Sequence, residues 1–188
     1  MISDDRLPTL TARRVALRWL TEADAGALYG IFSDPAVMRY WSTPPMSDIG
    51  QAHALVADIH QRFLARQLFQ WGVARLEDDR VIGTCTLFAI HEAQQRAEIG
   101  YALGHEHWGH GYMSEALTLL IDYAFSALAL RRLEADVDPR NAGSLRALER
   151  LGFRREGVLR ERWKVNGDVQ DSVVLGLLER AWRSGPAA

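Results

Sequence analysis

A long apolar segment, from Met113 to Leu128, dominates the hydrophobic pattern of this chain. Apart from Ser114, its polar exceptions recur every three or four positions, at Glu115, Thr118, Asp122 and Ser126. That spacing predicts a helix with one narrow polar stripe, buried on most of its sides. The preceding run 97–103 is short, apolar and bounded by turn-forming residues, which predicts a central strand.

Shorter patterns predict the remaining elements. In the first half of the chain they are a strand over 15–19, a helix from Thr21 to about Phe32, a helical turn at Asp34-Pro35, a helix capped by Ser47 and ending near Gln67, and a hairpin of 69–76 and 81–90. After the buried helix they are a strand over 132–137, a helix capped by Asn141 and ended by Gly152, and a hairpin of 154–165 and 169–177 joined by Asn166-Gly167. Strands that pair first as hairpins and then through two helical crossovers predict an α/β fold, a mixed sheet with helices on both faces.

Length and charge narrow the class of protein. A chain of 188 residues that is 48% hydrophobic is long enough for one domain and short for two, so we expect a single domain over 1–188 with its core at about 10–182. The 22 basic and 24 acidic residues are well mixed and leave a net charge of −2. Neither nucleic acid nor an anionic membrane is therefore an expected partner.

Two further features concern the compartment. Cys85 is the only cysteine, which excludes an internal disulfide and fits a reducing environment. The first residues are acidic and lack an apolar core, and no run approaches the roughly 20 apolar residues of a membrane span. A cytoplasmic protein is the expectation.

A turn with paired glycines, Gly109 and Gly111, separates the central strand from the buried helix. Glycines at this spacing let successive N–H groups point into one concavity at a helix N-terminus, where the helix dipole also favours an anion. The alternative is that both glycines only shape a loop. A dinucleotide-binding turn fits less well, because the third glycine is missing and four predicted strands precede the turn.

The histidines near this turn raise the question of a metal. His105, His107 and His110 lie close in sequence, but His105-Glu106 followed by His110 is one residue too long for the H-E-x-x-H pattern and is interrupted by Gly109. No metal site is predicted.

Several blocks, in order, resemble one family. They are Ala97-Glu98-Ile99-Gly100-Tyr101, Trp108-Gly109-His110-Gly111-Tyr112-Met113-Ser114-Glu115-Ala116-Leu117, Asn141-x-x-Ser144 and Leu151-Gly152-Phe153. Together they resemble the GNAT superfamily of N-acetyltransferases. With Ser33-Asp34-Pro35 near the start and Asn166-Gly167-Asp168 near the end, the chain is more narrowly similar to the branch that acetylates N-terminal residues of ribosomal proteins.

The resemblance implies a fold and a ligand. The implied fold is a mixed, mostly antiparallel seven-stranded sheet that splays open beside the strand of Tyr101, with acetyl-CoA in the opening and no metal. Backbone groups of Tyr101, Ala102 and Leu103 are implied to bind the pantetheine arm, and Asn141 and Ser144 to lie near the thioester. The diphosphate is implied to sit on the turn formed by His107, Trp108, Gly109, His110, Gly111 and Tyr112. Glu106 departs from the usual residue of this turn and must point away or pair with a neighbour.

The chemistry expected at such a site is attack of a neutral amine on a thioester, which needs a base and an acid. Glu98 is the candidate base and Ser144 the candidate acid, since Leu148 stands where many superfamily members carry a tyrosine. The alternatives are a salt-bridged glutamate on the sheet face and a hydroxyl that bonds only backbone. Trp163 stands where the ribosomal branch can carry a glutamate. Glu161, two residues away, is a substitute base if it shares the strand face.

The expected function is therefore transfer of acetyl from acetyl-CoA to a primary amine in a ternary complex. The acceptor is a protein N-terminus or a small molecule such as a polyamine or amino-sugar, and a homodimer is compatible with this function. The alternative function is a non-catalytic acyl-CoA-binding sensor.

Overall fold

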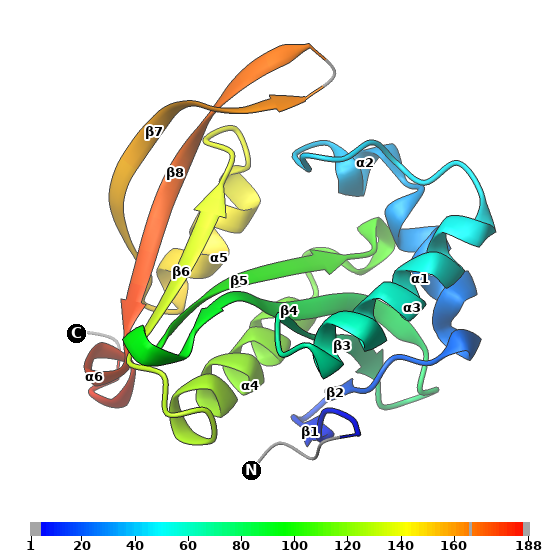
Figure 1. The fold of residues 1–188 in the computed structure, drawn as a ribbon, viewed down its shortest axis with the longest axis horizontal. Helices are drawn as coiled ribbons and strands as arrows, with labels where there is room; N and C mark the ends of the chain where they lie inside the picture. Colours follow the sequence, from blue (N-terminus) through cyan, green and yellow to red (C-terminus); the bar gives the residue numbers. More distant parts are fainter. Residues whose placement is uncertain (1–4, 166, 186–188) are drawn as a thin grey trace.

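The computed structural model describes residues 5–165 and 167–185. In these ranges one sheet of eight strands has the order β1-β2-β3-β4-β5-β6-β8-β7 (Figure 1). The strands are β1 (Leu10–Thr11), β2 (Val15–Arg18), β3 (Leu68–Arg75), β4 (Val81–His91), β5 (Arg96–Leu103), β6 (Arg132–Val137), β7 (Arg154–Val165) and β8 (Asp168–Leu178). The helices are α1 (Ala25–Phe32), α2 (Pro35–Met38), α3 (Ile49–Leu64), α4 (Tyr112–Ser126), α5 (Ala142–Arg150) and α6 (Glu179–Arg183). The mixed α/β fold is confirmed.

The strand count differs from the expected seven. The additional strand is β1, whose two residues pair with Leu17 and Ala16 of β2 at the edge of the sheet. A two-residue strand has no hydrophobic alternation of its own, so no pattern could predict it.

The sheet opens between β5 and β6. All other neighbouring strands are antiparallel, whereas β5 and β6 are parallel and pair only where 96–98 face 132–134. Beyond Glu98 the two strands diverge, as Figure 1 shows. The expected splay beside Tyr101 is therefore present.

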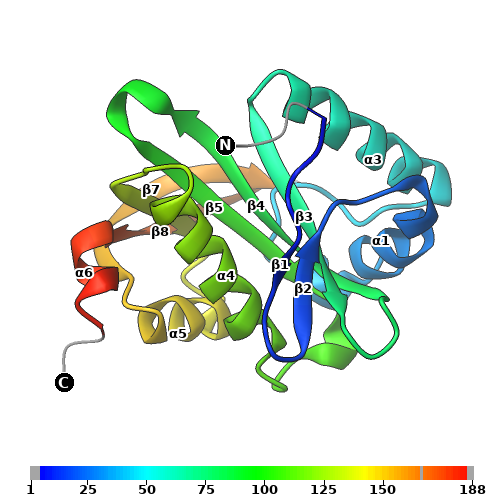
Figure 2. The same ribbon diagram turned by 90° about the horizontal axis from the view of Figure 1, so that it is seen from below.

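Helices cover both faces of the sheet (Figure 2). Helices α4 and α5 pack on one face and α1 and α3 on the other, each over its own hydrophobic core. In β5 the faces alternate, so that Ala97 and Ile99 belong to the α4 core and Ala102 to the α1–α3 core. Glu98 and Tyr101 consequently point to opposite faces.

Helix α4 has the predicted character. Seven of its side chains are buried, at Met113, Ala116, Leu117, Leu120, Ile121, Ala124 and Phe125. Its polar stripe is used by other elements, because Arg14 binds Glu115 through its backbone N–H and its side chain, and Trp182 donates to Asp122. Cys85 packs beneath this helix near Met113, and complete burial raises the pKa of its thiol.

Two predicted helix boundaries were wrong by a few residues. Asp48, not Ser47, caps α3, since the Asp48 carboxylate accepts the N–H of Gln51. The helix ends at Leu64 because Arg66 takes a left-handed conformation, with φ 55°. The predicted caps Asn141 and Gly152 are confirmed. Asn166 lies outside the described residues. No helix in the described ranges is both long and apolar enough to cross a bilayer.

Candidate active site

Two cavities meet at the splay between β5 and β6. The first, here called the acidic cavity, has a volume of about 460 Å³ and lies between the β7–β8 hairpin, β5 and the segment after α2. The second, here called the glycine groove, has about 490 Å³ and runs from β5 to the turn before α4. The two cavities share four of their lining residues, Trp41, Tyr101, Asn141 and Ser144. A ligand in one cavity can therefore touch a ligand in the other.

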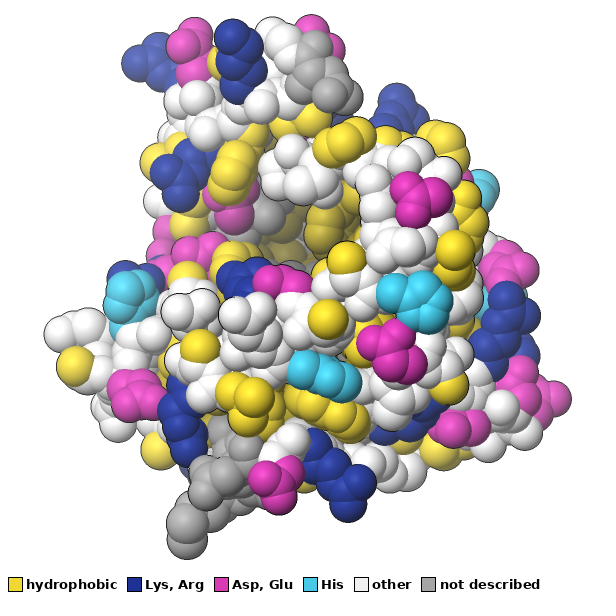
Figure 3. Space-filling model, turned by 45° about the vertical axis from the view of Figure 1, so that its right-hand side comes forward, with side chains coloured by type: hydrophobic (Ala, Val, Ile, Leu, Met, Phe, Trp, Pro, Cys, Tyr) yellow, Lys and Arg dark blue, Asp and Glu magenta, His cyan; other side chains and the backbone are white. Residues whose placement is uncertain are grey.

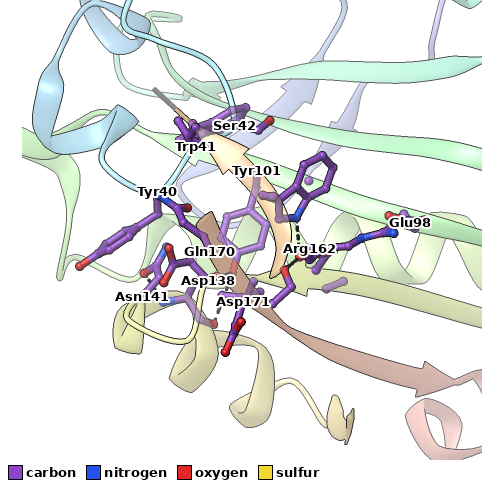
Figure 4. Close-up of a pocket in the computed structure, with 18 of the residues that line it drawn as sticks. Tyr40, Trp41, Ser42, Glu98, Tyr101, Asp138, Asn141, Arg162, Gln170 and Asp171 are labelled. Carbon is purple, nitrogen blue, oxygen red and sulfur yellow. Dashed lines mark hydrogen bonds and ion pairs between the residues drawn. The ribbon is translucent and has the colours of Figure 1, made fainter. Parts of the chain in front are cut away.

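Carboxylates and aromatic rings line the acidic cavity. Its acids are Glu98, Asp136, Asp138 and Asp171, and its basic side chain is Arg162. Tyr40, Trp41 and Trp163 provide the aromatic part of the wall. Figure 3 shows the hollow on this face with apolar side chains inside it, and Figure 4 shows Tyr101 between Tyr40 and Glu98. The excess of acids favours a cationic ligand.

Glu98 differs from the acids around it because its carboxylate bonds to none of the described residues. Asp136 accepts from Ser172, Asp138 from Arg140, and Glu134 from both Arg96 and Arg132. Burial, and then the negative charges of Glu134 and Asp136, raise the pKa of Glu98 above its ordinary value. A carboxylate with a raised pKa and no partner is suited to accept a proton from a ligand.

Tyr101 and Ser144 form a hydroxyl pair at the junction of the two cavities. The two side-chain oxygens are 2.6 Å apart, and burial raises the pKa of Tyr101 to about 12, so the phenol stays protonated at neutral pH. Asn141 caps α5 by accepting the N–H of Ser144 at 3.1 Å. This places the Ser144 hydroxyl in the first turn of the helix.

The side chain of Tyr101 was missed by sequence reasoning, which assigned this residue only a backbone role. Strand alternation puts Glu98 and Tyr101 on opposite faces, and only the splay lets both reach one space. The alternation in the sequence indicates opposite faces but contains no signal for the opening.

The turn before α4 has the predicted geometry. Gly109 and Gly111 both have left-handed backbones, with φ 77° and 80°. None of the described residues accepts a hydrogen bond from the N–H groups of Gly109, His110 or Gly111. These N–H groups and the N-terminus of α4 together form a place for an anion at the end of the glycine groove.

The other residues expected at this turn divide between two cavities. Ala102, Leu103 and Trp108 line the glycine groove with the two glycines, and Trp108 Nε1 donates to the Leu103 carbonyl at 2.7 Å. His107, His110 and Tyr112 instead line a separate cavity of about 290 Å³.

Glu106 lines that separate cavity, where its carboxylate lies 3.8 Å from the guanidinium of Arg80 and 3.2 Å from Nε2 of His107. Burial lowers the pKa of His107. In residues 5–165 and 167–185 no group of three or more His, Cys, Asp or Glu side chains is arranged to hold a metal.

Two basic residues of the groove were not predicted. Arg146 and Arg150 of α5 line it, and no ion pair joins either of them to an acid among the described residues. They lie four residues apart, and therefore on one side of the helix, while Leu145 and Leu148 are buried on another. This spacing was a signal that could have identified them as candidate ligands for an anion.

The strand face expected for Glu161 was wrong. Glu161 does not line the acidic cavity, although Trp163 does. The register of β7 is irregular between Leu159 and Trp163, and Glu161 has φ 54°, so the two residues do not share a face.

The chain is similar to known acetyltransferases over most of its length. Residues 14–154 match the model of the acetyltransferase (GNAT) domain. An uncharacterized N-acetyltransferase, p20 of Bacillus licheniformis, is 40% identical over 94% of this chain and 99% of its own.

Two solved structures share the fold. The spermidine N-acetyltransferase of Vibrio cholerae, in complex with CoA and spermine, has a TM-score of 0.80 and 23% identity over 90% of this chain and 98% of its own. The ribosomal-protein-S5-alanine acetyltransferase of Vibrio fischeri also has a TM-score of 0.80 and 23% identity, over 93% and 98%. One fold thus serves two different acceptors. On the strength of the domain match and the p20 relative, the chain belongs to the GNAT family of N-acetyltransferases.

Proposed function

We propose that this enzyme transfers acetyl from acetyl-CoA to a primary amine by direct attack, with the amine in the acidic cavity and the thioester at Tyr101 and Ser144. The observation that carries the proposal is the junction itself. An unpartnered carboxylate, Glu98, lines one cavity, free N–H groups line the other, and the hydroxyl pair lies where the cavities meet.

The acidic cavity acts first on the charge of the acceptor. Primary amines are mostly ammonium ions near neutral pH, since their pKa values lie at roughly 8 to 10.4. The carboxylates of the cavity attract this cation, but only the neutral amine is a nucleophile. Glu98, whose pKa is raised by burial and by Glu134 and Asp136, accepts the proton directly or through water.

The transfer then forms one bond and breaks another. The amine nitrogen attacks the thioester carbon, the C–N bond forms, and the C–S bond breaks. The leaving thiolate takes a proton from the Tyr101–Ser144 pair, in which Ser144 is the candidate acid and the Tyr101 hydroxyl its hydrogen-bond partner. The nitrogen loses its second proton as the amide forms, and this proton returns to the hydroxyl pair through water, while the proton held by Glu98 leaves to solvent. The products are an amide and CoA thiol, and no covalent enzyme intermediate is needed.

The glycine groove holds the donor. It is lined by Tyr101 and Ser144 and also by Gly109 and Gly111, so it can hold a ligand with a thioester at one end and phosphates at the other. The N–H groups of the turn and the dipole of α4 bind the diphosphate, and Arg146 and Arg150 add positive charge. Asn141 holds Ser144 toward the thioester.

Release of CoA thiol in the presence of a panel of amines tests this function. Ser144→Ala and Tyr101→Phe are each expected to lower kcat by roughly 10- to 100-fold, because each removes one half of a shared proton donor. The double variant is expected to have a kcat only slightly below that of the less active single variant. KM for acetyl-CoA is expected to stay the same in all three variants. Binding of acetyl-CoA without thiol release against every amine in the panel would contradict the proposal.

A glycine variant tests the donor site. Gly111→Ala is expected to weaken acetyl-CoA binding about tenfold, because an L-residue in the left-handed region costs roughly 1–2 kcal/mol. Its Cβ would also lie 3.1 Å from the guanidinium of Arg14, which would have to give way by a few tenths of an ångström. Titration calorimetry with CoA measures the effect. The matched control is Gly26→Ala, in helix α1, where an added Cβ meets nothing within 4 Å. Equal affinities of the two variants would argue against the turn as the binding site.

A further inference from the structure

A third cavity, here called the side cavity, opens from the acidic cavity. It has a volume of about 430 Å³, within the range of small-molecule sites, and lies between the sheet, α3 and the segment that follows α2. Trp41, Phe88 and Gly100 line both cavities. Gly100 follows Glu98 by two residues on the same face of β5, about 7 Å along the strand. A ligand whose amine meets Glu98 can therefore extend into the side cavity.

Three largely buried polar side chains, Gln70, Thr84 and Thr86, line the side cavity, and the residues are 7%, 1% and 9% exposed. Among the described residues no fully buried side-chain nitrogen or oxygen lacks a partner, so polar atoms of these three that have no partner are open to the cavity. Gln70 and Thr86 are directly paired across β3 and β4, and Thr84 lies on the same face two residues away. One amide and two hydroxyl groups are thus gathered in one small area.

These groups are available to a ligand. Polar atoms that face the cavity bond to water when it is empty, and a polar group that loses water without gaining a partner costs roughly 1–3 kcal/mol. Val or Leu at these positions would offer a ligand no hydrogen bond. The three groups are therefore suited to bind something that enters from the acidic cavity.

The side cavity also contrasts with the acidic cavity in charge. No charged residue lines it, and its remaining wall is largely aromatic and aliphatic, including Met38, Met46 and Leu55. A second ammonium group placed there would lose its hydration and find no carboxylate. A carboxamide would instead form hydrogen bonds with these side chains. Its NH2 group can donate to the Gln70 carbonyl and the threonine oxygens, and its carbonyl can accept from the Gln70 NH2 and the threonine hydroxyls. The carbon chain of the ligand would pack on the apolar wall.

Resting on the proposed function, we propose that the side cavity binds a neutral carboxamide group of the acceptor. The acceptor class is thus a primary amine that carries an uncharged amide a few atoms from its nitrogen, rather than a linear polyamine. Gln70, Thr84 and Thr86 are the specificity-determining residues.

Matched amines test this inference. δ-Aminovaleramide and cadaverine share a five-carbon chain and differ in whether a carboxamide or an ammonium group ends it, and pentylamine has neither. We expect kcat/KM to be about tenfold higher for the amino-amide than for pentylamine, because one or two net hydrogen bonds contribute about this factor. We expect kcat/KM to be lowest for cadaverine. Thr86→Val and Gln70→Leu are expected to remove the advantage of the amino-amide and leave pentylamine unchanged.

The outcomes separate the two proposals. Preference for cadaverine, or variants that change all three amines equally, would overturn the side-cavity inference while the acetyl transfer stands. Calorimetric binding of valeramide, the amide without an amine, tests the cavity without turnover. Valeramide should bind to the unmodified enzyme but not to Thr86→Val. If it binds to neither protein, the inference is overturned even if amines are acetylated. Both variants are expected to unfold at nearly the same temperature as the unmodified enzyme, because each replaces a side chain that lines the cavity by an apolar one of similar size.

Discussion

Replacing Glu98 by Gln is expected to lower kcat for amine acetylation by about 10²- to 10³-fold, the range of a general base that is lost. The amide keeps the size of the side chain but has no basic oxygen to take the proton of the ammonium ion. KM for acetyl-CoA is expected to change little, because Glu98 does not line the glycine groove. Steady-state thiol release at saturating acetyl-CoA measures both quantities.

The pH profile gives an independent test of Glu98. In the unmodified enzyme kcat/KM should fall on the acid side of a pKa that lies above the ordinary glutamate value, since burial, Glu134 and Asp136 disfavour the carboxylate. In Glu98→Gln this fall of kcat/KM at acid pH should be absent, and only the pH dependence that comes from ionisation of the amine substrate should remain. A variant with the same profile as the unmodified enzyme would assign the base to another group. Asp171→Asn, a second acid of the same cavity, is the matched control and should retain the acid limb.

Thermal unfolding shows whether Glu98→Gln remains folded. A carboxylate whose pKa is higher in the folded than in the unfolded chain binds its proton more tightly when folded. Ionisation of Glu98 therefore destabilises the fold. The full loss of stability is present at pH values above the pKa of the folded chain, and there is no loss at pH values below the pKa of the unfolded chain. Glu98→Gln should consequently melt at a higher temperature than the unmodified enzyme near pH 8, and this difference should shrink as the pH falls toward about 4.

Trp71→Ala is expected to have the largest effect on stability, about 3–5 kcal/mol, as for other large aromatic side chains removed from a core. Trp71 is fully buried between the sheet and α4, its ring lies edge-on to Tyr123, and its Nε1 donates to the Pro8 carbonyl at 2.9 Å. Alanine would leave a cavity beneath α4 and free the Pro8 carbonyl. For a chain of this length the unfolding temperature should fall by roughly 6–20 °C.

Trp163→Ala is the matched control for this prediction. Trp163 lies on β7 and is 42% exposed, so its removal should change the free energy of unfolding by no more than about 0.5 kcal/mol. Denaturant unfolding followed by circular dichroism compares the two variants. Equal losses would mean that Trp71 does not organise the core under α4.

The proposed acceptor site suggests how one fold can serve different amines. In the proposed arrangement the donor is held by backbone N–H groups and a helix N-terminus, which depend on the two glycines more than on particular side chains. The acceptor would meet side chains from distant segments, namely β5, the β7–β8 hairpin and the segment after α2. Substitutions in those segments change the acceptor with little effect on the donor groove.

Local pattern alone determined most of the secondary structure and the glycine turn that we propose as the donor end of the site. The apolar period of 113–128, the paired glycines at 109 and 111, and Asn141 before a helix act through neighbours in the chain, so a linear sequence contains them. Glu98 and Ser144 could be chosen as base and acid by their residue types and by resemblance.

Tertiary structure alone decided what these residues can reach. The divergence of β5 from β6 brings Glu98 and Tyr101 to one space from opposite faces of a strand, and pairing of β3 with β4 gathers Gln70 and Thr86. The irregular register of β7 removes Glu161 from the cavity and keeps Trp163. These outcomes depend on strand register and divergence, which arise from packing between residues far apart in the sequence and leave no periodic signal in it.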